Sequence, residues 1–425
     1  MVGSEAGRYN PRTLARMHDD STIQVDLAAI TYNMGIFAAL VARGTAICGV
    51  IKADAYGLGA VHIAPTLWES SCMLAVFRVE EAIEVLQVVP DARILVLGPV
   101  RGLHAVHPLA APLATGNVHL VVHDQRHAEE LDVFAREQGL VLPVHLEVDT
   151  GLSRGGCLLE DTPAMITMLR HTPSLRLAGV MTHYSSAGID GGETASQHRL
   201  FRAALAASGP LPEQCQIHVA ATAGSLREAG SHHDMIRIGM GWCGVVPGVS
   251  SLADHLPTPL RPAVRWRSRI VQLRDVRAGL RVGYGGAWTS RRDSRIANVP
   301  AGYADGVPVS AGAHDGDTSS RAMVAICGPD AGARVDAIGY APIIGAVSMD
   351  QIAIDVTDVP GADRIRPGRT VELISMNSGS PTSLSELARR CGLTPHQVLT
   401  GISPRIGRQI IQRPETNAAP AALAV

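Results

Sequence analysis

Apolar residues in the first half of the chain occur in short runs, each bounded by turn residues or by a stretch with helical periodicity. Helix-like stretches such as Arg126–Gln138 and Ala164–Arg170 lie between several of these runs. Repeated strand–helix units of this kind predict an α/β fold of the (β/α)8 TIM-like barrel type, and a doubly wound open sheet is the alternative. The eight predicted strands are Cys48–Asp54, Leu74–Val79, Arg93–Gly98, Val118–Asp124, Pro143–Asp149, Leu175–His183, Gln216–Ala221 and Met235–Gly239.

The pattern changes after Leu256, where short alternating runs follow one another between Gly, Pro and Asp turns. Little of this part is helical before Ser383–Arg390, so it predicts a separate, mostly β domain. Its predicted strands are Arg269–Leu273, Ser294–Val299, Ala322–Cys327, Gln351–Val356 and Thr370–Ile374. The expected parts are a loose N-terminal arm (1–21), a barrel (22–255), a β-rich C-terminal domain (256–413) and a flexible tail (414–425).

The bulk composition excludes several classes of protein. A net charge of −2 gives no electrostatic reason to bind nucleic acid or an anionic membrane. No apolar stretch is long enough for a membrane span, and the N-terminus lacks the apolar segment of a secretory signal. Seven cysteines without a C-x-x-C pair indicate neither a disulfide framework nor a zinc site. We therefore expect a cytoplasmic protein that binds neither nucleic acid nor membrane.

Lysine occurs once in the sequence, at Lys52, and the other 36 of the 37 Lys and Arg residues are arginine. Arginine can replace lysine where only a positive charge is needed, but not where a primary amine has to lose its proton and attack a carbonyl. The alternative, one lysine left by chance on a solvated surface, fits poorly with the apolar run before Lys52 and the Gly-containing turn after it. Lys52 is therefore a candidate for a residue that forms a Schiff base.

Further polar residues fall at the C-terminal ends of the predicted strands, where a TIM barrel carries its chemistry. Each has an ordinary structural explanation when taken singly, as a hydrogen-bonded histidine, an ion-paired arginine or an Asx turn. Their joint placement at one rim favours an active site. The set is Lys52 after the first strand, Asp149 and Arg154 after the fifth, His183 ending the sixth, Thr222 after the seventh and Arg237 in the eighth.

Two segments at the same rim suit a phosphate group. The backbone of Thr222–Ser225 and of Gly239–Gly241 follows the seventh and eighth strands, where barrels commonly bind phosphate through N–H groups. The glycines alone are a weak signal. A Schiff-base lysine beside a phosphate site suggests pyridoxal 5′-phosphate (PLP) as the cofactor.

In these and further motifs the sequence resembles the alanine racemases, which are fold-type III PLP enzymes. The similarity runs in the family's order from about Ile23 to Arg408. The matching motifs are Val50–Gly57, Val148–Arg154, Met181–Tyr184, His218–Thr222, Met235–Met240, Val282–Gly285, Pro300–Gly306 and Met349–Gln351. The resemblance implies supply of D-alanine, for the cell wall or for a dedicated pathway.

The resemblance also implies roles for the matched residues. Lys52 would hold PLP and act as the base on one face of the substrate Cα, while Tyr284 of the partner subunit would act on the other face. A free tyrosine is a poor base at neutral pH, because its pKa is about 10. A network through His183 to Arg237 would favour the phenolate. Arg237 would bond the pyridine nitrogen without releasing its proton, which limits side reactions.

The remaining roles concern the phosphate and the substrate. The resemblance implies an obligate homodimer with shared active sites and a small amino-acid substrate. Arg154 and the Met349 backbone would place the substrate carboxylate, and Tyr303 and Asp350 would line the access to the site. The phosphate would be held by Tyr56, Thr222, Gly239 and Met240, with His396 at the place of a family tyrosine.

Four positions depart from the family pattern. Glu147 stands where many members carry a carbamylated lysine, and we expect its carboxylate to take part of the role of fixing Arg154. A position elsewhere for Glu147 is equally open. His396 replaces a tyrosine and changes the shape and polarity of the pocket. Ser348 and Leu58 replace a common cysteine and a common histidine.

Other functions stay open. A racemase or epimerase of the same fold could act on a larger or polar amino acid, which His396 motivates. A fold-type III decarboxylase typically uses a cysteine where this chain offers Tyr284. A metal-assisted aldolase would need ligands, for which His232–Asp234 is a thin candidate. A PLP-homeostasis protein would leave residues 256–413 unexplained.

Overall fold

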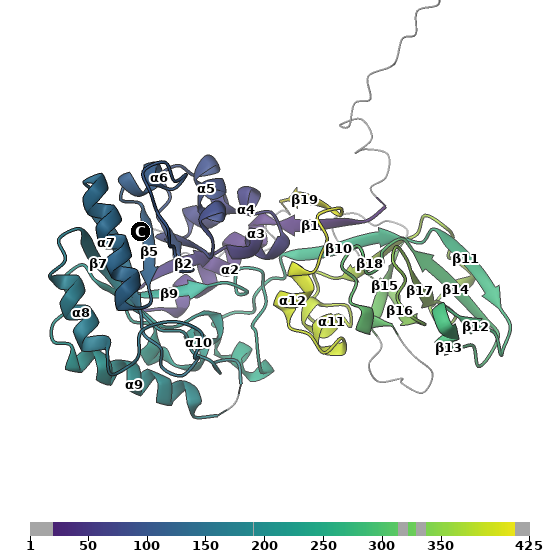
Figure 1. Cartoon of the computed structure of the whole chain (residues 1–425). Helices are drawn as coiled ribbons and strands as arrows, with labels where there is room; N and C mark the ends of the chain where they lie inside the picture. The colour runs from purple at the N-terminus through teal and green to yellow at the C-terminus, as the bar shows by residue number, and fades with distance from the viewer. Residues whose placement is uncertain (1–19, 190, 313–321, 329–336, 413–425) are drawn as a thin grey trace, which may run out of the picture. The chain divides into compact units, whose positions relative to one another are not determined.

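The computed structural model describes residues 20–189, 191–312, 322–328 and 337–412 (Figure 1). The chain divides into two compact units. One is Asp26–Ala263 with the segment from Ile410, and the other combines the segment up to Val25 with Val264–Gln409. Most of the predicted N-terminal arm and all of the predicted tail lie outside the described residues.

The first unit contains an eight-stranded parallel sheet, in the order β8-β7-β6-β5-β4-β3-β2-β9. A parallel bridge between Ala221 and Arg237, with a hydrogen bond from Arg237 N to Ala220 O, joins β8 to β9 and closes the barrel. The barrel prediction is therefore confirmed over the open sheet. Its strands are β2 (Ala46–Val50), β3 (Met73–Val76), β4 (Ile94–Val96), β5 (Val118–Val122), β6 (Leu142–Glu147), β7 (Leu175–Met181), β8 (Gln216–His218) and β9 (Met235–Ile238).

Helices lie between and around these strands (Figure 1). In α7, for example, the apolar residues Leu131, Phe134 and Ala135 are buried on one face of the helix. Asp124 caps α7 by accepting a hydrogen bond from His127 N over 2.7 Å. The helices are α2 (Leu27–Leu40), α4 (Ala60–Glu69), α5 (Val79–Val88), α6 (Ala110–Ala114), α7 (Gln125–Gln138), α8 (Thr162–Arg170), α9 (Glu193–Ala207) and α10 (Thr222–Arg227).

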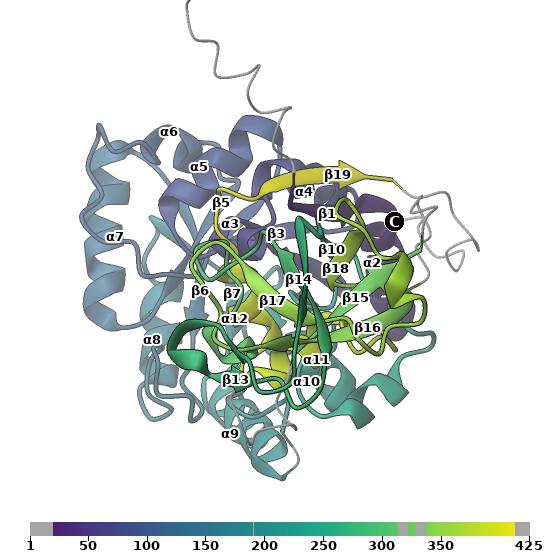
Figure 2. The same cartoon turned by 90° about the vertical axis from the view of Figure 1, so that its right-hand side faces the viewer.

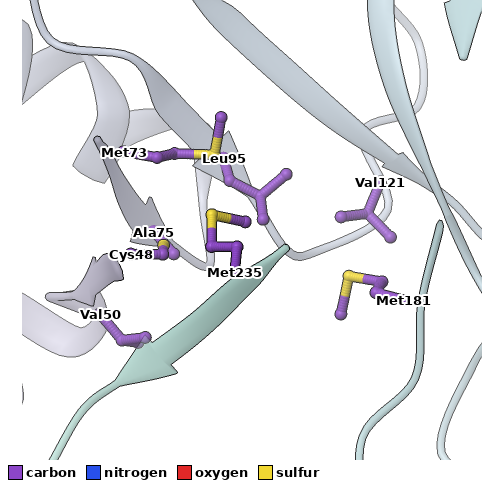
Figure 3. Close-up of a cluster of buried hydrophobic side chains, with 8 residues drawn as sticks. All are labelled: Cys48, Val50, Met73, Ala75, Leu95, Val121, Met181 and Met235. Carbon is purple, nitrogen blue, oxygen red and sulfur yellow. The ribbon is translucent and has the colours of Figure 1, made fainter. Parts of the chain in front are cut away.

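The barrel strands are almost wholly buried, which explains their continuous apolar runs. Alternate side chains of a strand point to the same face, so Cys48 and Val50 of β2 share a cluster with Met73 and Ala75 of β3. Figure 3 shows this cluster, which contains Cys48, Val50, Met73, Ala75, Leu95, Val121, Met181 and Met235.

The chain departs from the prediction directly after β2. The predicted strand ran to Asp54, but β2 ends at Val50 and the next segment, α3 (Lys52–Gly57), turns with the opposite hand. Ala53, Asp54, Ala55 and Tyr56 all have positive φ, between 51° and 59°. Each such non-glycine residue costs about 1–2 kcal/mol. The segment that carries the lysine is therefore held by contacts outside itself.

The second unit contains a nine-stranded sheet, in the order β11-β14-β17-β16-β15-β18-β10-β1-β19, and its described pairings are antiparallel. This agrees with the predicted mostly β domain. The strands are β1 (Thr22–Asp26), β10 (Val264–Arg269), β11 (Gln272–Val276), β14 (Ser294–Val299), β15 (Met323–Cys327), β16 (Ala337–Ile344), β17 (Ile352–Asp355), β18 (Thr370–Ile374) and β19 (Gly407–Ile411). A small pair, β12 (Arg281–Val282) and β13 (Trp288–Thr289), and helices α11 (Leu384–Arg390) and α12 (Pro395–Thr400) complete it.

The division between the units differs from the predicted boundary at 255/256. It falls at Ala263/Val264, and β1, which the prediction assigned to the barrel, is a strand of the β-rich sheet. Figure 2 shows β1 beside β19 in this sheet. None of the helices in the described ranges has the length and apolar character needed to cross a membrane.

Candidate active site

Lys52 follows the C-terminal end of β2 and is half-buried. Burial lowers the pKa of its amine, and the positive charge of Arg154 lowers it further. Glu81 acts against this shift, and the charge of Arg237 adds to it. An amine held in this way loses its proton more readily than a free lysine, as a nucleophile or base requires.

Arg237 on β9 is buried, and its guanidinium is surrounded by acceptors. Nη1 donates to His218 Nδ1 (2.9 Å) and His218 O (2.7 Å). Nη2 donates to Thr182 O (2.8 Å), Val219 O (3.1 Å) and His183 Nδ1 (3.3 Å). Burial and the nearby positive charges lower the pKa of His183 to about 3, so this imidazole is neutral and Arg237 carries the charge.

A row of buried histidines continues from Arg237 through the barrel interior. His218 Nε2 lies 2.8 Å from His145 Nδ1, and His145 Nε2 lies 2.8 Å from His119 Nδ1. Burial lowers the pKa of all three, that of His119 to about 4. None of the three histidines was predicted as a site residue, although each is a polar position inside an apolar strand run, which is a usable signal.

The predicted phosphate residues converge on one point of the rim. The backbone N–H groups of Gly239 and Gly241 donate to Thr222 Oγ1 over 3.2 and 3.3 Å. Any Cβ on Gly239 would lie 2.3 Å from Tyr56 Oη, so only glycine fits beside this phenol. Burial raises the pKa of Tyr56, which keeps its hydroxyl as a donor. Met240 is buried next to them.

Arg154 lies on the loop between β6 and α8. Asp149 starts this loop as an Asx turn, because its Oδ1 accepts from Gly151 N (2.9 Å) and Ser153 N (3.1 Å). Ser153 has a φ of 54°, so the residue before Arg154 is held in the left-handed region. The loop therefore fixes the backbone from which the Arg154 side chain extends, and the charge of this side chain acts on Lys52.

Glu147, the last residue of β6, is buried beneath the same loop. Its Oε2 lies 3.1 Å from His123 Nδ1, and within the described ranges no ion pair joins it to Arg154. Its carbonyl accepts from Cys157 N over 2.8 Å. Any Cβ on Gly155 would lie 3.2 Å from His123 Nδ1, so the loop lies directly on the carboxylate–imidazole pair.

Three of the predicted residues of the second unit are brought together by backbone contacts. Tyr303 N donates to Ser348 O (3.0 Å), next to Met349, and Asp350 follows. Arg405 bridges Asp350 Oδ1 and Asp305 Oδ1, each over 2.6 Å.

Tyr284 belongs to the same neighbourhood of that unit. Any Cβ on the preceding Gly283 would lie 3.2 Å from Ala346 N, on the segment that leads to Met349. The side chains of Tyr284, Tyr303 and Met349 are exposed by 75%, 45% and 53%. The three side chains are therefore open to solvent on segments that contact one another.

The other three residues that depart from the family pattern, His396, Ser348 and Leu58, make ordinary structural contacts. His396 is half-buried on α12, and its carbonyl accepts from Thr400 Oγ1 (2.8 Å). Ser348 N donates to Gln351 O (3.0 Å), and Leu58 is fully buried.

The side chains of His232–Asp234, the candidate metal ligands, bond to other groups of the protein. His232 Nε2 bonds Ser225 O (2.7 Å), His233 pairs with His198, and Asp234 accepts a backbone N–H. Within the described parts of the chain, no group of three or more His, Cys, Asp or Glu side chains is arranged to hold a metal ion.

Comparisons with known proteins agree with this architecture. Family models described as "Alanine racemase, N-terminal domain" and "Alanine racemase, C-terminal domain" match residues 25–247 and 263–410. The alanine racemase of Sorangium cellulosum is 35% identical over 396 residues, covering 91% of this chain and 97% of that protein. The alanine racemase of Syntrophobacter fumaroxidans is 32% identical over 386 residues, covering 90% and 95%.

Solved structures give the same result. The alanine racemase of D-cycloserine-producing Streptomyces lavendulae has a TM-score of 0.79 at 26% identity, covering 93% of this chain and 97% of that one. The alanine racemase of Bartonella henselae, described with covalently bound pyridoxal phosphate, has a TM-score of 0.76 at 26% identity, covering 92% and 99%. On its two matched domains and its near full-length similarity to these relatives, this chain belongs to the alanine racemase family.

Proposed function

We propose that this protein is a PLP-dependent racemase that interconverts L- and D-alanine. The observation that carries the proposal is the position of Lys52, the one lysine of the sequence, at the end of a barrel strand beside Arg154 and Arg237. The names of the relatives support alanine as the substrate. A cytoplasmic location stays a prediction from the sequence.

The residues at the barrel rim fit PLP. The hydroxyls of Tyr56 and Thr222 lie around one point next to Gly239, whose N–H donates to Thr222 Oγ1, so the hydroxyl proton of Thr222 can be donated to a phosphate oxygen. At the ring end, Nη1 and Nη2 of Arg237 are occupied, whereas its Nε has no partner among the described residues and can face a ring nitrogen. Met240 and His396 would complete the phosphate end.

When bound, PLP supplies the conjugated electron-withdrawing system that makes the Cα–H of an amino acid acidic. Lys52 would take or return the proton on one face of Cα, for which its lowered pKa suits it. Tyr284 of the partner subunit would do the same on the opposite face. Inversion needs both groups, because one removes the proton and the other replaces it.

Arg237 would favour racemisation over side reactions. An arginine keeps the proton at Nε, so it donates a hydrogen bond without protonating its acceptor. The neutral His183 on its Nη2 would extend the influence of the guanidinium charge towards Tyr284.

Substrate binding would draw on two chains of a homodimer, with Tyr284, Met349 and Asp350 contributed by the partner subunit. Arg154 and the Met349 backbone would hold the carboxylate of alanine, with Tyr303 and Asp350 at the access. The exposure of Tyr284, Tyr303 and Met349 supports a partner subunit on this surface.

The test is incubation of the PLP-loaded protein in D₂O with single L-amino acids, followed by chiral chromatography and mass spectrometry. We expect alanine to become racemic with one deuterium at Cα, and Lys52→Arg to be inactive. Racemisation of larger amino acids in place of alanine would show a different substrate, and release of CO₂ would show a decarboxylase.

A further inference from the structure

The turn that carries Lys52 has to be fixed from outside, because four successive residues have left-handed φ. Its far end is held by Asp54, whose Oδ1 accepts from Ala60 N over 2.6 Å. Its near end is held by a residue of the neighbouring strand–helix unit, Glu81 on α5.

Glu81 uses both carboxylate oxygens. Oε1 accepts a hydrogen bond from Ala53 N, the residue directly after Lys52. Oε2 accepts from Phe77 N (2.8 Å) and Arg78 N (2.9 Å), at the start of α5. One half-buried side chain therefore ties the lysine turn to the loop between β3 and α5.

All three partners of Glu81 are N–H donors, and this requires a carboxylate. A glutamine has one acceptor oxygen, and its NH2 group would face an N–H on the other side. If the amide oxygen stays on Phe77 and Arg78, the start of α5 remains capped while Ala53 loses its acceptor. The negative charge is lost in either orientation.

We propose that Glu81 is a positioning residue for Lys52, which fixes the left-handed turn through Ala53 N and holds a negative charge beside the lysine turn. The role of Lys52 itself rests on the proposed function. The direction in which Glu81 moves the pKa of Lys52, upwards against burial and Arg154, agrees with this arrangement.

The single lysine makes a direct test possible. An amine-acylating reagent can modify the full-length chain only at Lys52 and at the N-terminal amine, and peptide mass spectrometry separates the two. The rate of acylation of Lys52 against pH, in the PLP-free protein, reports the deprotonated fraction of its amine. The variant is Glu81→Gln, and the matched control is Glu80→Gln, one residue away and exposed.

We expect Glu81→Gln to acylate Lys52 about three- to tenfold faster at a fixed pH below the midpoint, since a nearby charge is removed. Glu80→Gln should follow the wild type. A wild-type profile for a folded Glu81→Gln overturns the proposal. PLP should protect Lys52 from acylation in the wild type, and absence of protection there would contradict the proposed function without changing the comparison in the PLP-free chain.

A second variant keeps the test decisive if Glu81→Gln does not fold. Glu81→Asp retains the charge and the cap of α5 but is too short to reach Ala53 as well. We expect a wild-type acylation profile with kcat for racemisation lowered about tenfold or more, because a small misplacement of the reacting group is costly. Wild-type kcat in this variant overturns the positioning role.

Discussion

The hydrogen bond from Arg237 Nη1 to His218 Nδ1, 2.9 Å long, can run in one direction only. A guanidinium has no acceptor, so His218 Nδ1 must carry a lone pair and the ring proton of His218 must be on Nε2. That proton is donated to His145 Nδ1, which places the proton of His145 on Nε2, directed at His119 Nδ1. One arginine therefore orders the tautomers of three histidines.

We predict that His119, His145 and His218 are all neutral and carry the proton on Nε2. Nitrogen-15 NMR of the labelled protein distinguishes the two neutral tautomers and the cation by the shifts of the ring nitrogens. The lowered pKa of each ring means that this pattern should hold at neutral pH. A proton found on Nδ1 of His218 would contradict the arrangement.

The same histidines predict how stability depends on pH. The pKa of His119 in the folded protein is about 4, against 6.5 for a free histidine, so the unfolded chain binds more protons between these values. Stability should be highest above pH 6.5 and fall as the pH is lowered towards 4. The loss from this residue is about 3 kcal/mol.

Denaturant unfolding at a series of pH values measures this effect. His119→Asn keeps an acceptor near the position of Nδ1 but does not titrate, so its stability should fall less steeply between pH 6.5 and 4. The exposed His62→Asn is the control and should keep the wild-type slope. Equal slopes for His119→Asn and the wild type would count against a buried neutral imidazole.

Replacing Tyr284 by phenylalanine should separate the two halves of the reaction. Racemisation should fall by about 10²-fold or more, because a general acid–base group is lost. Exchange of the α-hydrogen for deuterium, with retention, should continue in one enantiomer through Lys52. Tyr340→Phe removes a hydroxyl elsewhere in the β-rich unit and should leave both activities unchanged; equal loss of exchange and inversion in Tyr284→Phe would argue against two separate bases.

Removing the charge of Glu147 should weaken substrate binding. The Glu147–His123 pair lies under the loop of Arg154, so Glu147→Gln should raise the KM for alanine by about three- to tenfold with a smaller effect on kcat. His123→Leu removes the donor on the other side of the same pair and should give a similar change. An unchanged KM in both variants would mean that Arg154 is held independently of this pair.

Adding a single methyl group at Gly239 should impair PLP binding. The new Cβ would lie 2.3 Å from Tyr56 Oη, so the phenol or the Gly239 backbone has to move. We expect a loss in PLP affinity of about tenfold or more, equal to about 1.4 kcal/mol, measured by titration of the PLP-free protein. Gly35→Ala, where nothing lies within 4 Å of the added Cβ, should bind PLP as the wild type does.

The barrel could be predicted from the sequence because its strands are buried on both sides and read as continuous apolar runs. The left-handed turn after β2 could not be predicted, because Ala53, Asp54 and Ala55 are not glycines and nothing in the local sequence indicates a positive φ. Their conformation depends on hydrogen bonds made by the side chains of Glu81 and Asp54. Strand β1 was missed because its partner in the sheet is far away in the sequence.

The site was predicted in part for similar reasons. Polar residues that follow a predicted strand can be selected as site candidates from their position alone, as Lys52 and Arg154 were. The pairing of Glu147 with His123 needed the knowledge that β5 and β6 are neighbours, and both residues sit at the same end of those strands. The sequence left two positions for Glu147 open, one that helps to fix Arg154 and one elsewhere, and in the described residues its ion pair is with His123 and not with Arg154.

The place of β1 in the β-rich sheet has a consequence for biosynthesis. Gln24 bonds Arg265, 241 residues later, and Gln409, 385 residues later. As the chain leaves the ribosome, β1 stays unpaired until the whole barrel and β10 have been made, and its second partner, β19, comes only near the end of the β-rich segment. Such long-range pairing slows folding and leaves an open edge exposed to wrong partners. A fragment that starts at Val264 would lack the strand between β10 and β19, so the nine-stranded sheet also needs Thr22–Asp26, from the other side of the barrel sequence.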